Sequence, residues 1–328
     1  MSELTGRGAA WTEERGTSDE ERGTSDEGRR RLWAPRRRAG GTVAEQAPRA
    51  VVAVVTDSTA CLPSDLAARY GIRVVPLRVV AGRVAVDDGP AALSGPIEEE
   101  LRHGARLSTA SPAPERFAAA YAAAAAGGAE AVVSVHVSAG LSGTVNSAVL
   151  AAADAEVPVR VVDSRSLGMG LGIAALAAAE AAAAGQALED VADAASRRAA
   201  RLRSFFVLDT LDRLHAGGRL PPASGRAGSA LTARPLLHVA DGTLAVLERV
   251  RTPSAAARRL EEMTVEFAAA RPVDLAVQHL GHPERGAALA ERLERLVPGA
   301  RRRYLAEAGA VILAHTGPGM LGVVVAPY

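Results

Sequence analysis

Blocks of apolar residues separated by short polar segments run through most of the chain, and the first block predicts a buried strand. Residues 51–55 read VVAVV between polar neighbours, which is typical of a strand covered on both faces in a parallel sheet. Pro63 suits the first turn of a helix that runs to about Tyr70, and Gly71 ends it. Residues 74–80 then predict a second strand. The order strand–helix–strand favours a parallel sheet.

The same alternation continues to about residue 185, where an alanine-rich helix ends at a glycine. We expect strands over residues 131–137 and 159–162, and helices over residues 117–126, 147–153, 172–184 and 188–201.

After Ser204 the pattern changes to short strands joined by turns, with two amphipathic helices among them. We expect strands over residues 205–208, 236–239, 244–249, 275–279, 311–314 and 323–325, and helices over residues 258–270 and 284–296. The predicted fold class is therefore α/β with two domains. A parallel α/β/α sheet domain covers residues 50–185, and a mixed α+β domain covers residues 186–328.

Residues 1–49 carry a different pattern, in which apolar residues are too few to offset the entropy of ordering. The heptapeptide ERGTSDE occurs twice in a row over residues 14–27, and two arginine triplets follow at residues 29–31 and 36–38. We predict a disordered N-terminal tail. Its triplets offer a surface for transient contact with an anionic membrane, and the alternative is a solvated tail without a partner.

Charge and composition exclude several classes of function. All 38 basic residues are arginine, so the chain lacks the lysine of a phosphate-binding P-loop and of a Schiff-base enzyme. The first fifty residues hold 10 of the arginines and 9 of the acidic residues, which leaves 28 of each for the remainder. This neutral body argues against nucleic acid as a partner, because nucleic-acid binding requires a clustered basic face.

A single cysteine, Cys61, excludes an internal disulfide and suits a reducing compartment. The sequence also lacks an apolar run of the ~18 residues expected of a membrane span, and it lacks a secretion signal. We therefore expect a cytoplasmic protein. Aromatic residues make up only 3%, so its core must consist of alanine, valine and leucine.

Small hydroxyl residues follow three of the predicted parallel strands, at residues 56–59, 138–144 and 163–166. Ligands of parallel α/β sheets bind beyond the carboxyl ends of the strands. Hydroxyls and backbone amides at a helix start form an anion site, and Gly143 permits close approach of a ligand. The alternative is that Ser142 or Thr144 only caps the following helix.

Two further interpretations are open from the residues alone. Ser58 or Ser142 could act as a nucleophile, which would make the protein a serine-dependent acyl hydrolase. Ser58 lacks the flanking glycines of a nucleophile elbow, and a helix cap is the simpler interpretation of this residue. Arg219 follows two glycines that free its side chain to reach a carboxylate or phosphate, and the alternative is an exposed turn arginine.

Metal and dinucleotide sites are not indicated. His279 and His282 are three residues apart, but a strand end and a turn separate them. Gly317, Gly319 and Gly322 match a dinucleotide fingerprint in spacing only, because a strand rather than a helix is predicted after them. We therefore expect neither a metal nor a cofactor.

Several segments, taken in order, resemble the DegV family of bacterial lipid-binding proteins. The resemblance covers about residues 51–328. The segments that carry it are VTDSTACLP (residues 55–63), VVPL (74–77), DDG (87–89), STASPAPERF (108–117), SVHVSAGLSGTVNSA (134–148), VVDSRSLGMGLG, FFVLDTLDRLHAGGRL, RVRT and HTGPGMLG.

The resemblance implies two α/β domains with a long-chain fatty acid bound between them. It implies that Thr109 and Ser142 hold the carboxylate of the fatty acid, with Arg219 and His315 near the head group. It further implies a binding protein rather than an enzyme, which presents the acid to a separate fatty acid kinase for acyl phosphate formation in phospholipid metabolism. The chain departs from the family pattern at Cys61, at Ala85 and at Ala110-Ser111.

Overall fold

The computed structural model describes residues 51–89, 91–93, 95–220 and 233–328, so the predicted tail lies outside the described residues. The first element of the described residues is the strand β1, which lies between β2 and β6 in a four-stranded sheet of order β2-β1-β6-β7. All neighbouring pairs are parallel, as predicted. The strands are β1 (Val52–Asp57), β2 (Arg73–Val75), β6 (Ala131–His136) and β7 (Val159–Asp163).

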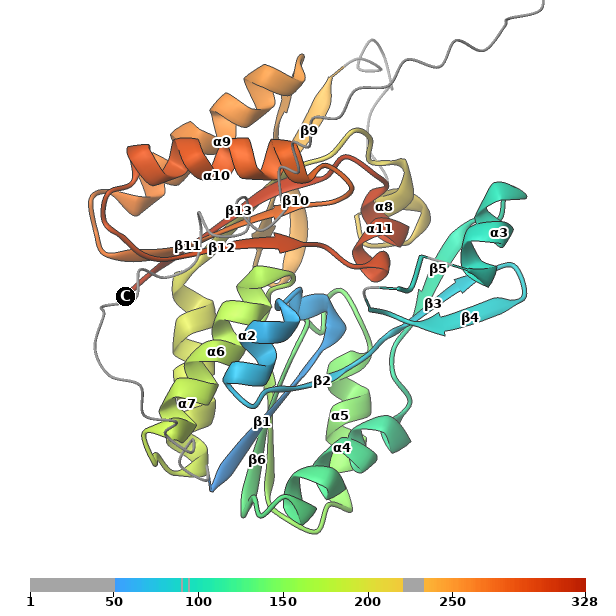
Figure 1. Ribbon diagram of the computed structural model, residues 1–328, viewed down its shortest axis with the longest axis vertical. Coiled ribbons are helices and arrows are strands. Elements are labelled where there is room, and N and C mark those ends of the chain that lie inside the picture. Colours follow the sequence, from blue (N-terminus) through green and yellow to red (C-terminus); the bar gives the residue numbers. More distant parts are fainter. Residues whose placement is uncertain (1–50, 90, 94, 221–232) are drawn as a thin grey trace, which may run out of the picture. The chain divides into compact units, whose positions relative to one another are not determined.

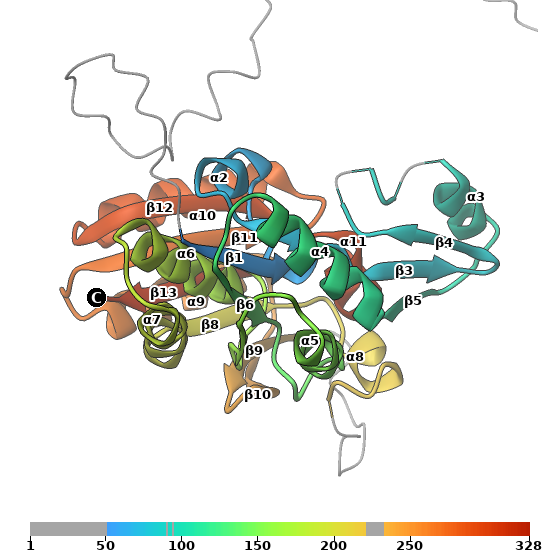
Figure 2. The same ribbon diagram turned by 90° about the horizontal axis from the view of Figure 1, so that it is seen from below.

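Helices cover both faces of this sheet (Figures 1 and 2). One apolar cluster joins α4 (Pro114–Ala126) and α5 (Thr144–Ala153) to β1, β2 and β6. Another joins α6 (Met169–Ala183) and α7 (Leu188–Arg201) to the opposite face. Alanines make up most of α6, which lets this helix lie close to the strands. The short α2 (Ser64–Arg69) follows a 3-10 turn, η1 (Ser58–Ala60).

The segment between β2 and α4 forms a small antiparallel sheet of order β4-β3-β5. Its strands are β3 (Arg78–Ala81), β4 (Val84–Asp87) and β5 (Leu107–Ala110), with α3 (Pro96–Arg102) beside them. The single strand predicted over residues 74–80 is therefore wrong. Pro76 divides it into β2 and β3, because proline has no amide hydrogen for a ladder and ends strand pairing.

The rest of the chain forms a six-stranded mixed sheet of order β10-β9-β8-β13-β11-β12. Its strands are β8 (Arg203–Val207), β9 (Arg234–Ala240), β10 (Thr243–Val250), β11 (Val273–His279), β12 (Ala300–Glu307) and β13 (Leu321–Pro327). Only β11 and β12 pair in parallel, and the other pairs are antiparallel. The helices α9 (Pro253–Ala268) and α10 (Pro283–Leu296) pack on one face. The predicted α/β class with a parallel sheet and a mixed sheet is confirmed.

The apolar run at residues 311–314 is helical, so the predicted strand there is wrong. It lies within α11 (Ala310–Thr316), which packs against β3 and β5. A buried carboxylate explains the helix start, because Asp88 Oδ1 accepts a hydrogen bond from the amide of Val311 at 3.3 Å. Short apolar runs fit a buried helix as well as a strand, and here a distant side chain decided between them.

The strands of the parallel sheet lie between residues 52 and 163, and those of the mixed sheet lie between residues 203 and 327. The helix α7 packs on β6 and β7 although it follows the domain boundary that we placed near residue 185. That boundary stays a prediction. Of the helices that the structure describes, none is long and apolar enough to cross a membrane.

Candidate functional site

Thr109 and His315 come together where α11 packs against the small sheet. Thr109 lies on β5, opposite Val79 of β3, and His315 lies in the last turn of α11. Because α11 packs against β5, the hydroxyl Oγ1 of Thr109 reaches Nε2 of His315 at 2.8 Å. Both side chains are partly buried. The pair places a hydroxyl and an imidazole on one wall of the candidate site.

Ser142 belongs to a row of three hydroxyls at the start of α5. Its Oγ lies 3.0 Å from the Oγ of Ser111 and 2.8 Å from Oγ1 of Thr144. It also accepts a hydrogen bond from the amide of Thr144 at 3.3 Å. Gly143, not Ser142, occupies the capping position of the helix. Ser142 therefore supports the helix start and still presents a partly exposed hydroxyl, so the two readings of this residue are compatible.

Arg219 connects these two groups of residues. Its Nε donates to the carbonyl of Leu141 at 3.2 Å, directly before Ser142, and its guanidinium also bonds to the carbonyl of Gly217. Burial and the positive charge of Arg219 lower the pKa of His315 to about 4. The imidazole is therefore neutral at pH 7. Arg219 is thus not an exposed turn arginine.

The glycines before Arg219 allow this close arrangement. A Cβ added at Gly217 would lie 2.9 Å from Nδ1 of His315 and 3.1 Å from the carbonyl of Arg213. Any larger residue at position 217 would displace the imidazole. The requirement for glycine here is thus steric, and it arises from a residue almost a hundred positions further along the chain.

Thr109 and Ser111 are two residues apart on an extended segment that continues β5, so their side chains share one side of it. Ser111 was not singled out from the sequence as a site residue. It is the hydroxyl that joins the Thr109 segment to Ser142. The departure from the family pattern at this position was the signal that could have found it.

A buried polar chain joins β1, β6 and α4, and it was not predicted from the sequence. The carboxylate of Asp57 bonds to Nδ1 of His136 at 3.0 Å and to the amide of Val137 at 3.0 Å. Nε2 of His136 lies 2.6 Å from Oγ of Ser134, which accepts from the hydroxyl of Tyr121 at 3.0 Å. All four side chains are almost fully buried, so substrate cannot reach this Ser–His–Asp array, and its role is to hold β1 and β6 together at their carboxyl ends.

Neither serine considered as a nucleophile has a catalytic partner among the described residues. Ser58 accepts a hydrogen bond from the amide of Leu77 at 3.1 Å and bonds to the buried Asp88, whose pKa is raised by burial. Ser142 bonds to the hydroxyls of Ser111 and Thr144 and to the amide of Thr144, and to no histidine or carboxylate among the described residues. The described residues also hold no group of three or more His, Cys, Asp or Glu side chains suited to a metal ion. The arrangement thus provides hydroxyl donors and a guanidinium, which are groups that bind a carboxylate.

A family profile described as an uncharacterised protein of the DegV family matches residues 51–328. The chain belongs to the DegV family. Among curated relatives, a DegV domain-containing protein of Streptomyces coelicolor is 48% identical over 274 residues, which cover 84% of this chain and 98% of the relative. A DegV domain-containing protein of Mycobacterium tuberculosis is 40% identical over 279 residues, covering 84% and 96%.

Solved structures of the DegV family share the fold. A DegV family protein of Thermus thermophilus, described by its fatty acid binding, has a TM-score of 0.77 and 33% identity, covering 84% of this chain and 99% of that one. DegV of Bacillus subtilis, a fatty acid binding protein, has a TM-score of 0.75 and 31% identity with the same coverage. The predicted family and fold class are confirmed, whereas the roles of Thr109, Ser142, Arg219 and His315 stay predictions.

Proposed function

We propose that this protein binds a long-chain fatty acid and that the hydroxyls of Thr109 and Ser142 hold its carboxylate. The single observation that carries the proposal is the bridge made by Arg219. This arginine bonds to the carbonyl beside Ser142 and lies close enough to His315 to lower its pKa. The two hydroxyls predicted to bind the ligand are thereby tied to one positive charge, which a carboxylate would neutralise.

The protonation state of His315 favours this chemistry. A neutral imidazole can carry its proton on Nε2 and donate it to the oxygen of Thr109. The hydroxyl hydrogen of Thr109 is then free to point at a carboxylate oxygen. Ser142 receives comparable support from Ser111 and Thr144. Such a site holds an anion by hydrogen bonds and needs no catalytic base.

The acyl tail requires only an apolar environment, which a chain rich in alanine, valine and leucine can supply. Each buried CH₂ contributes roughly 0.8 kcal/mol, so the roughly fourteen CH₂ groups of a sixteen-carbon acid contribute about 11 kcal/mol before the costs of ordering. The fatty acid binding of the solved family members is the comparison that supports this ligand class.

The proposal includes a carrier role, in which the bound acid is presented to a separate fatty acid kinase. This role rests on the family resemblance. It predicts that acyl phosphate forms only when this protein, a kinase and ATP are incubated together, which mass spectrometry of the products measures.

Native mass spectrometry tests the binding site directly. The protein purified from bacteria should carry acyl chains, and the double variant Thr109→Ala with Ser142→Ala should lose them. Ser108→Ala is the matched control, because Ser108 lies on the same strand with an exposed side chain and should leave occupancy unchanged. Full lipid occupancy in a folded double variant would show that the site assignment is wrong.

A further inference from the structure

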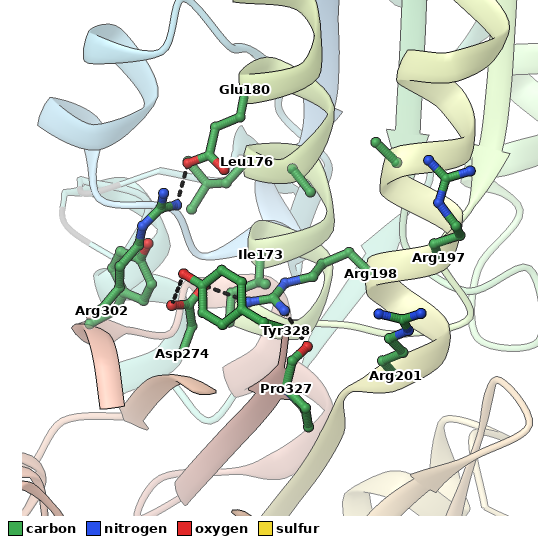
Figure 3. Close-up of a pocket in the computed structure, with 13 residues that line it drawn as sticks. Ile173, Leu176, Glu180, Arg197, Arg198, Arg201, Asp274, Arg302, Pro327 and Tyr328 are labelled. Atoms are coloured by element: carbon green, nitrogen blue, oxygen red, sulfur yellow. Dashed lines mark hydrogen bonds and ion pairs between the residues drawn. The ribbon is translucent and has the colours of Figure 1, made fainter. Parts of the chain in front are cut away.

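A pocket of about 300 Å³ lies among α6, α7 and the strands β11, β12 and β13 (Figure 3). None of its lining residues is Thr109, Ser142, Arg219 or His315. One face of α6 and one face of α7 line it, since the lining residues of each helix are spaced three or four positions apart. Of its six charged side chains, four are arginines and two are acids.

Both acids in the pocket already have partners. The carboxylate of Asp274 accepts a hydrogen bond from the guanidinium of Arg198 at 2.5 Å and another from the hydroxyl of Tyr328 at 2.6 Å. The guanidinium of Arg198 also lies over the ring of Tyr328, 4.5 Å from its centre. This cluster is nearly buried, with 11% of the Arg198 side chain and 4% of the Asp274 side chain exposed.

Glu180 is neutralised in the same way. It forms an ion pair with Arg302 and accepts a hydrogen bond from the hydroxyl of Tyr70 at 3.2 Å. Two arginine–acid pairs therefore account for both carboxylates. The positive charge that remains belongs to Arg197 and Arg201, one turn apart on α7.

These two arginines are available to an anion. Arg197 has one contact, an exposed pair with Asp193 at 3.4 Å, and such pairs contribute little to stability. Within the part of the chain that the structure describes, Arg201 has no ion pair and no side-chain hydrogen bond. Figure 3 shows both side chains on α7, the helix from which Arg198 reaches towards Asp274 and Tyr328. The remaining wall is apolar and consists of Ile173, Leu176, Ala177 and Ala194.

We propose that this pocket binds a phosphate monoester that carries a compact apolar or aromatic body. Two planar guanidinium groups match the oxygens of a phosphoryl group, which carries a charge of about −1.5 to −2 at pH 7. Two of the four arginines that line the pocket have no partner among its lining acids, and Arg197 keeps only its exposed pair with Asp193. The apolar wall of α6 receives the body of the ligand. The same chemistry occurs in soluble phosphate esters and in the headgroup of phosphatidic acid.

Calorimetric titration of the full chain with phenyl phosphate tests the proposal. We expect saturable binding that is tighter than binding of inorganic phosphate, and a weakening of about tenfold or more in the double variant Arg197→Gln with Arg201→Gln. The matched control is Arg102→Gln. Arg102 is an exposed helical arginine with a partner four residues away, as Arg197 is, but it lies on α3. The Arg102→Gln variant should bind phenyl phosphate as the unmodified protein does.

Vesicles distinguish the two sources of the phosphoryl group. Co-sedimentation with vesicles of phosphatidic acid in phosphatidylcholine, lost in the double variant, supports the site and identifies a lipid headgroup. Binding of phenyl phosphate without binding to these vesicles supports the site and identifies a soluble ester. The proposal is overturned if neither probe binds at up to about 10 mM, or if the double variant binds as tightly as the control.

Discussion

The hydroxyl of Thr109 lies 2.8 Å from Nε2 of His315, although 206 residues separate them in the chain. One strand of the small sheet and one short helix bring them together, and that helix starts at the buried carboxylate of Asp88. The position of the imidazole therefore depends on a side chain in a third segment.

Replacing His315 by alanine should weaken fatty acid binding by about fivefold, which corresponds to the loss of one hydrogen bond of about 1 kcal/mol. The variant removes the partner that orients the hydroxyl of Thr109. Competition with a fluorescent fatty acid measures the affinity. His103→Ala, at an exposed position after α3, is the control and should bind normally. Equal affinity of both variants for the fatty acid would show that His315 does not contribute to the site.

Single substitution of Ser142 separates its two roles. Ser142→Ala removes one acceptor from the amide of Thr144, so the free energy of unfolding should fall by only about 1 kcal/mol. Lipid occupancy should fall much more, because the proposed contact between Ser142 and the carboxylate is lost as well. Urea unfolding and native mass spectrometry measure the two quantities. Unchanged occupancy with reduced stability would leave Ser142 as a helix cap alone.

Gly217→Ala should disturb the imidazole of His315. The new Cβ would lie 2.9 Å from Nδ1, and we expect a loss of about 1–3 kcal/mol in stability together with weaker fatty acid binding. The control is Gly89→Ala, because a Cβ there meets nothing within 4 Å and the backbone does not need glycine. Urea unfolding should show this loss of stability in Gly217→Ala and not in Gly89→Ala. A stable Gly217→Ala protein with normal binding would contradict the packing argument.

Stability should fall as the pH falls below about 6.5. Burial lowers the pKa of His315 to about 4, and it also lowers the pKa of His238 and His279. The unfolded chain binds protons at these groups more readily than the folded chain does. The contribution of these neutral histidines to the free energy of unfolding is therefore complete above pH 6.5. It is lost progressively towards pH 4, at no more than about 1.4 kcal/mol per pH unit for each histidine.

Urea unfolding at pH 7 and pH 5 measures this dependence. His315→Gln should show a smaller loss of stability over this range than the unmodified protein, because one of the titrating groups is absent. An identical pH dependence in the two proteins would contradict the lowered pKa of His315.

The buried polar chain that joins β1, β6 and α4 should be essential for stability. Asp57→Ala leaves Nδ1 of His136 and the amide of Val137 without their acceptor, and we expect a loss of about 3–5 kcal/mol in unfolding free energy. Asp65→Ala, at an exposed position on α2, is the control and should change stability little. Comparable stability of the two variants would show that the chain of hydrogen bonds is dispensable.

Much of the fold was predictable because its strongest signals are local. The apolar run that forms β1 and the alanine-rich sequence of α6 specify their elements without reference to distant residues. Where the signal was ambiguous, the prediction failed. Residues 311–314 suit a strand or a helix equally, and the contact with Asp88 selected the helix. β12 was not predicted, because its three consecutive arginines hide the apolar pattern of a strand. An edge strand tolerates such charges on its exposed side.

By itself, the sequence determined the α/β class, the parallel first sheet, the DegV resemblance and the identity of Thr109, Ser142, Arg219 and His315 as candidates. Only the tertiary structure decided which of these side chains meet. It paired Thr109 with His315, added Ser111 as the neighbour of Ser142, and placed Arg219 beside both groups. The reason is physical: periodicity and turn chemistry act over a few residues, whereas a binding site forms where strand ends and helix ends from distant segments pack together.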